Sequence, residues 1–155
     1  MPTSIWTLAL VAILLPIAWI DARRQIIPDS LNLLLAILGL VYLYVAFGSG
    51  ALPQRVLAAA VVAIFFFIIR KLYSHLRGQT GLGLGDVKFL AAATLWLGPL
   101  GLPWLVLFAS ISGLAWHIVA SRHANSASLL QRIAFGPHLA VGFLATWIWQ
   151  PQSML

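Results

Sequence analysis

Long apolar stretches separated by short polar or glycine-containing segments run through the whole chain. A helix that crosses the hydrocarbon core of a bilayer needs about 20 apolar residues, with a range of about 17–25. The pattern predicts six membrane-spanning helices, of which the third, fourth and sixth must be extended at their ends or tilted. We expect these spans near Ser4–Ile20, Leu31–Phe47, Val56–Ile69, Val87–Leu100, Trp104–Ala120 and Leu139–Trp149.

The composition excludes an ordinary soluble protein and a disordered chain, because 62% of the 155 residues are hydrophobic and only 8% are charged. We therefore expect an all-α, polytopic membrane helical bundle that forms a single domain over residues 1–155. The first apolar run has no Lys or Arg before Arg23 and no convincing cleavage site after it. It is interpreted as a retained span and not as a signal peptide.

The basic residues are concentrated in alternate loops, although the net charge is +6. Short basic clusters between apolar runs favour contact with a lipid bilayer, and we expect no nucleic-acid partner. Because basic loops stay in the cytoplasm, the asymmetry places both termini outside. The loops on one side carry Arg23, Arg24, Arg70, Lys71, Arg77, Arg122 and Arg132, whereas those on the other carry only Arg55.

The chain contains only three carboxylate side chains, Asp21, Asp29 and Asp86, and each lies where a predicted span begins or ends. Ionisable groups next to hydrocarbon are costly and are therefore functional candidates. The topology places all three at the cytoplasmic face. Two carboxylates that share one proton can activate water and protonate a substrate carbonyl, which is the chemistry of aspartic proteases. Asp21 and Asp86 are the natural pair.

Two of the aspartates also have a structural interpretation. Asp29 is placed to cap the helix that we expect to begin at Leu31. Asp21 alone could be neutralised by Arg23 or Arg24 in a surface ion pair of little energetic value.

Asp86 could likewise cap a helix that begins at Val87, with Lys88 as its charge partner. This interpretation does not account for Gly83 and Gly85. Glycine permits backbone conformations closed to other residues and the close approach of a substrate strand or a neighbouring helix.

Other catalytic chemistries find little support. The chain has no cysteine, and its four histidines show no metal-ligand spacing, so we expect neither a metal nor another cofactor. Ser110 and Ser112 lie within the predicted fifth span without a Gly-x-Ser-x-Gly motif or a histidine partner. We therefore reject serine catalysis.

Three stretches together carry a family resemblance: Asp21 with Ile27-Pro28-Asp29, Gly83-Leu84-Gly85-Asp86-Val87-Lys88, and Phe135-Gly136-Pro137-His138-Leu139-Ala140. The chain resembles the type IV prepilin peptidases. The resemblance implies endopeptidase cleavage of the basic leader peptide of type IV prepilins or pseudopilins at the cytoplasmic face, typically just after a glycine. It implies Asp21 and Asp86 as the catalytic pair. It also implies a multi-pass protein of the bacterial inner (cytoplasmic) membrane. The residues expected to bind substrate or support the site are Gly83, Gly85, Lys88, Pro28, Asp29, Gly136 and Pro137.

One departure from the family concerns the N-terminal region. Many members carry an additional region there, with a zinc-binding cysteine cluster, and also N-methylate the new amino terminus. This chain has neither that region nor a cysteine. It looks like the short form, so we expect no methyltransferase activity and no binding of S-adenosylmethionine.

Two other functions remain open. The chain could be a related protease that acts on another membrane preprotein, such as an archaellin-type preprotein or a signal peptide, although Ile27-Pro28-Asp29 argues against the latter. It could also be a non-catalytic assembly scaffold or a proton-conducting protein in which Asp21 and Asp86 form a polar pair. The particular substrate and the oligomeric state are left open.

Overall fold

The computed structural model describes residues 3–78, 81–123 and 134–149, and within these ranges it contains helices and no strand. The protein is an all-α membrane helical bundle, as the sequence predicts. Its elements are α1 (Thr3–Arg24), α2 (Asp29–Phe47), the 3-10 turn η1 (Ser49–Ala51), α3 (Leu52–Arg77), α4 (Leu84–His123) and α5 (Gly136–Trp149).

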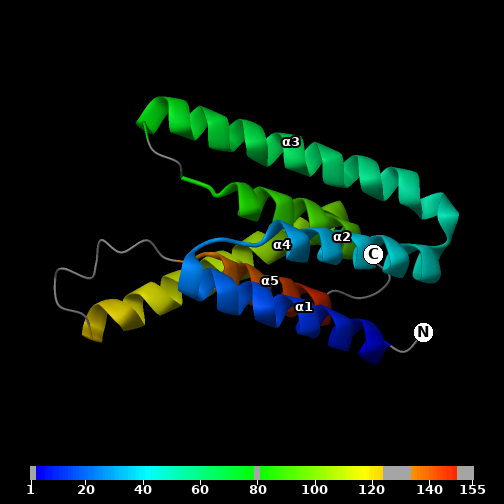
Figure 1. Ribbon diagram of the computed structural model, residues 1–155, viewed down its shortest axis with the longest axis horizontal. Coiled ribbons are helices and arrows are strands. Elements are labelled where there is room, and N and C mark those ends of the chain that lie inside the picture. Colours follow the sequence, from blue (N-terminus) through cyan, green and yellow to red (C-terminus); the bar gives the residue numbers. More distant parts are fainter. Residues whose placement is uncertain (1–2, 79–80, 124–133, 150–155) are drawn as a thin grey trace.

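The long helix α4 contains two of the predicted spans. Gly98 has φ 71° and ψ 172°, which is not helical, and Pro99 follows it directly. In Figure 1 the chain turns back after the first half of α4, and the second half runs in the opposite direction. The break lies slightly before the position expected from the sequence. The six predicted spans therefore correspond to α1, α2, α3, the two halves of α4, and α5.

Four helices of the described ranges, α1 to α4, are long and apolar enough to cross a membrane. Helix α3 is extended at both ends relative to the predicted third span, as we expected. It ends at Gly78, whose left-handed backbone allows its N–H to donate to the Ser74 carbonyl at 3.0 Å. Helix α1 continues through Asp21 to Arg24, so that Asp21 belongs to its last two turns.

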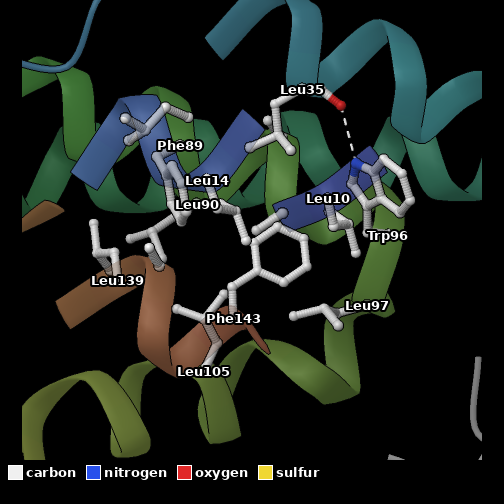
Figure 2. Close-up of a cluster of buried hydrophobic side chains, with 14 of the residues drawn as sticks. Leu10, Leu14, Leu35, Phe89, Leu90, Trp96, Leu97, Leu105, Leu139 and Phe143 are labelled. Carbon is white, nitrogen blue, oxygen red and sulfur yellow. Dashed lines mark hydrogen bonds between the residues drawn. The ribbon is translucent and has the colours of Figure 1, made fainter. Parts of the chain in front are cut away.

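The core lies where the first half of α4 is enclosed by α1, α2 and α5 (Figure 2). Trp96 of α4 donates its indole N–H to the Leu35 carbonyl of α2 at 2.9 Å. Its ring also stacks on Tyr42, with ring centroids 5.2 Å apart. Other fully buried side chains of this core are Leu10, Leu14, Phe89, Leu90, Leu97, Leu105, Leu139 and Phe143.

Helix α3 differs from the rest, because it contains no buried residue. Leu57 is 65% exposed and Ile64 is 60% exposed. Figure 1 shows α3 along one edge of the bundle. Such an apolar helix surface is suited to contact with lipid, whereas Val62 and Phe66 of α3 are partly buried and pack against the core.

Chain reversal brings one set of helix ends together. Figure 1 shows the end of α1 and the starts of α2, α4 and α5 at the same end of the bundle, where α3 also ends. The three aspartates lie on these helix ends, as the topology predicts. Of the basic residues used for orientation, Arg132 lies outside the described residues.

Candidate active site

A cavity of about 720 Å³ opens at the end of the bundle where the aspartates lie. Both Asp21 and Asp86 line this cavity, and they are close enough to interact electrostatically. Within the described residues, no group of three or more His, Asp or Glu side chains could hold a metal ion. The other lining residues are Gln25, Ile26, Ile27, Asp29, Gly81, Gly83, Leu84, Gly85, Lys88, Ala134 and Phe135.

Asp21 is held by the start of α5. Its side chain is buried, and its Oδ2 atom accepts the backbone N–H of Gly136 at 2.7 Å. The amides of a first helical turn have no partner within the helix, and a helix N-terminus favours negative charge. A Cβ atom added to Gly136 would lie 2.6 Å from this Oδ2 atom, so the contact requires glycine.

The alternative interpretation of Asp21, an ion pair with the following arginines, does not hold in the described part of the chain. The guanidinium of Arg23 instead lies over the Trp19 ring, 4.2 Å from its centroid. The side chain of Asp21 is buried, whereas Arg23 and Arg24 are exposed.

Asp86 lies in the first turn of α4, and its Oδ2 atom accepts the backbone N–H of Gly83 at 3.2 Å. The alternative in which Asp86 caps a helix beginning at Val87 does not hold, because α4 already begins at Leu84. The Asp86 side chain reaches back to an amide before the helix, which is one half of a capping box. The bond fixes the carboxylate at the cavity wall.

At the two glycines before Asp86, the absence of a side chain matters and the backbone conformation does not. Neither has a positive φ, so this part of our expectation was wrong. A Cβ on Gly85 would lie 3.0 Å from the Cβ of Ile27, which confirms the expected close approach of a neighbouring segment. A Cβ on Gly83 would lie 3.0 Å from the Asp86 Oδ2 atom.

Asp29 and Lys88 form an ion pair across the rim of the cavity, with Nζ and Oδ1 2.7 Å apart. Lys88 therefore pairs with Asp29, and not with Asp86 as the capping alternative required. The predicted cap by Asp29 was also wrong, because α2 begins at Asp29 itself and its N-cap residue is Pro28. The Pro28 carbonyl accepts the backbone N–H groups of Leu31 and Asn32, each at 3.2 Å.

Pro137 is the second residue of α5, where the missing N–H of proline costs no helical hydrogen bond. The first helical bond of this segment joins the Leu139 N–H to the Phe135 carbonyl at 2.9 Å. The Phe135-Gly136-Pro137 segment thus starts the helix and also contributes to the site.

Sequence reasoning missed Asn32, which is buried in the first turns of α2. Its Nδ2 atom donates to the Gly85 carbonyl at 3.2 Å and so ties α2 to the residue before Asp86. An amide inside an otherwise apolar run was the available signal, because a buried polar group needs a partner.

Sequence reasoning also missed the partner of Ser112. Its Oγ atom lies 2.7 Å from Nδ1 of His138. The pair joins the second half of α4 to α5. Within the described residues, neither side chain bonds to a carboxylate that could orient the imidazole. The pair is therefore a link between helices and does not form a Ser-His-Asp triad.

Comparison with known proteins gives a consistent result. Residues 8–118 match the type IV leader peptidase family. The chain is 40% identical over 138 residues to the prepilin leader peptidase/N-methyltransferase of Burkholderia pseudomallei, covering 88% of this chain and 44% of that protein. It is 36% identical to the protein of that name from Neisseria gonorrhoeae, covering 87% and 43%. A type 4 prepilin-like proteins leader peptide-processing enzyme of Escherichia coli is 30% identical, covering 94% and 53%.

The chain thus spans about half the length of these curated relatives. No solved structure matches it.

Proposed function

Because the chain belongs to the type IV leader peptidase family, we propose that it is a membrane-bound aspartic endopeptidase with Asp21 and Asp86 as its catalytic residues. Its substrates are type IV prepilins or pseudopilins, from which it removes the basic leader peptide. One observation carries this proposal: two carboxylates from different helices line a single cavity, and each is held by a glycine amide.

The proposed reaction uses the two carboxylates in different protonation states. The ionised carboxylate takes a proton from a water molecule, which attacks the scissile carbonyl, while the protonated one donates to the carbonyl oxygen. The leaving amine then takes a proton as the C–N bond breaks. Each carboxylate is held through Oδ2, so in the described structure its Oδ1 atom is left for the water and the substrate.

The cavity in this proposal faces the cytoplasm. Arg23 and Arg24 end α1, and His75 and Arg77 lie in the last turn of α3, at the same end of the bundle as the aspartates. Basic residues at one set of helix ends favour the cytoplasmic side of a bacterial inner membrane. Methylation, which the relatives' names also mention, is outside the proposal.

The test is cleavage of a prepilin that carries its native leader, by the protein reconstituted in liposomes. We expect wild type to release the leader, and Asp86→Asn to lower kcat/KM by about 100- to 10,000-fold, the range for general acid–base groups. Ser121→Ala is the matched control, because this hydroxyl is exposed and bonds only to the Ile118 carbonyl of its own helix. Undiminished cleavage by Asp86→Asn would overturn the catalytic role of Asp86, whereas a wild type that releases no leader would favour the scaffold or proton-conducting alternative.

A further inference from the structure

A second cavity, of about 600 Å³, lies between α2, α3 and α4. We call it the alanine groove, because six of its fourteen lining residues are alanines: Ala36 of α2, Ala59, Ala60 and Ala63 of α3, and Ala91 and Ala92 of α4. Small residues allow the backbone of another helix to approach closely within a membrane. The volume is within the usual range of ligand pockets, about 300–1,000 Å³.

The alanine groove adjoins the candidate active site. Asp29 and Lys88 line both cavities, so the groove begins at the rim of the cavity that contains the catalytic aspartates. A chain whose scissile bond lies between Asp21 and Asp86 can therefore continue directly into the groove.

Asn32 lines the polar end of the groove and is only 4% exposed. Its Nδ2 atom donates to the Gly85 carbonyl, which can only accept, so the orientation of the amide is fixed. The Oδ1 atom is buried and has no hydrogen-bond partner among the described residues. A buried acceptor without a donor costs about 1–3 kcal/mol. This end of the groove therefore contains an acceptor that has no N–H donor.

A peptide segment that enters the groove must be helical, because a chain in the membrane has to satisfy its own backbone hydrogen bonds. The first turn of a helix has free N–H groups and favours nearby negative charge. Asn32 Oδ1 is an acceptor at the polar end, where the Asp29 carboxylate is already paired with Lys88. The unpaired acceptor matches the N-terminus of a helix and not its C-terminus, and a lipid acyl chain offers no donor at all.

We propose that the alanine groove binds the apolar helix that directly follows the scissile bond of the substrate, with a first-turn N–H donating to Asn32 Oδ1. This inference rests on the proposed function and adds to it the part of the substrate that the enzyme holds. The helix thereby anchors the substrate and fixes the position of the scissile bond at the aspartates.

Disulfide crosslinking tests the proposal without cleavage, because the chain has no cysteine of its own. Ala60→Cys lies in the groove, whereas Val61→Cys is the control, since Val61 is 57% exposed and does not line it. Both are placed in an Asp86→Asn background and mixed with prepilins that carry single cysteines before or after the cleavage site. We expect Ala60→Cys to crosslink at helical spacing to positions after the site. Equal crosslinking of Val61→Cys, no crosslink, or crosslinks only to the leader would overturn the proposal.

Filling the groove provides a second test. Ala63→Phe occupies the groove, and Val61→Phe adds the same ring outside it. We expect Ala63→Phe to lower kcat/KM for the whole prepilin by about tenfold or more, because remote binding energy is lost. A soluble peptide that ends shortly after the scissile bond should be cut equally by both variants. Unchanged cleavage of the whole prepilin would overturn the groove proposal, whereas a wild type that cuts neither substrate would overturn the proposed function, and crosslinking would still decide the groove.

Discussion

Two regions of the bundle, the aspartate end and an aromatic cluster, each contain a glycine that leaves space for a side chain of another helix. The consequences differ between the two regions. The aromatic cluster consists of Trp6, Tyr42, Trp96 and Trp147, with neighbouring ring centroids 5.2–6.1 Å apart. Gly39 admits the Trp96 ring there, because a Cβ would lie 2.7 Å from its Nε1 atom. At the aspartate end, the corresponding space at a glycine is filled by a carboxylate. Space made for a ring stabilises the fold, whereas space made for a carboxylate positions reactive atoms.

Among changes outside the catalytic aspartates, the largest effect is expected from Gly136→Ala at the aspartate end. The added Cβ would lie 2.7 Å from the Cβ and Cγ atoms of Asp21, so the carboxylate must move. Cleavage should fall by about 100-fold, the cost of a misplacement of about 1 Å. Gly113→Ala is the control, because its Cβ would meet His138 at an ordinary 3.6 Å. Normal kcat/KM for Gly136→Ala would contradict the positioning role of this contact.

Gly39→Ala applies the same change to the aromatic cluster. Displacement of the Trp96 ring breaks its bond to the Leu35 carbonyl, so the free energy of unfolding should fall by about 1–3 kcal/mol. At temperatures where the protein stays folded, kcat should remain close to that of wild type. Thermal unfolding in detergent micelles measures the first effect, with Gly50→Ala as the control, since no atom lies within 4 Å of its added Cβ. Loss of kcat without loss of stability would contradict the purely stabilising role of the aromatic cluster.

Ser112→Ala tests the link between α4 and α5. Loss of one hydrogen bond to His138 should lower the free energy of unfolding by about 1 kcal/mol. Cleavage should persist, because Ser112 is not a nucleophile in this account. Thermal unfolding and cleavage are measured with Ser121→Ala as the control. Complete loss of cleavage with an intact fold would instead support serine catalysis.

The smallest effect is expected from Lys88→Met at the rim of the cavity. The two partners of this ion pair are 50% and 74% exposed, so its loss should cost about 0–1 kcal/mol of stability. The difference from wild type should shrink further at high salt. Thermal unfolding at low and high ionic strength measures both, and a loss of several kcal/mol would show that the rim pair is a structural element comparable to the aromatic cluster.

The common location of the three aspartates could be predicted from the sequence, because short loops force successive spans to reverse direction. The partners of these aspartates could not be predicted in the same way. A helix that is apolar on all sides carries no periodic signal for its rotation. The contacts of Asp29 with Lys88 and of Asn32 with Gly85 depend on that rotation.

The break inside α4 shows a similar limit. Glycine and proline recur at Gly98, Pro99, Gly101 and Pro103, so the composition allows several positions for a reversal. Packing selects Gly98, where a Cβ would overlap the guanidinium of Arg55 from α3. The contact comes from another helix, so no local pattern could identify it.

The most direct test of the central claim compares Asp21→Asn, Asp86→Asn and the double variant in one cleavage assay with folded, reconstituted protein. When two groups act as a unit, the effects of removing them are not additive. Each single variant should therefore lose about as much activity as the double variant. A single variant that keeps most of the wild-type rate would contradict a shared catalytic pair. So would a double variant whose fold-loss of rate equals the product of the two single fold-losses.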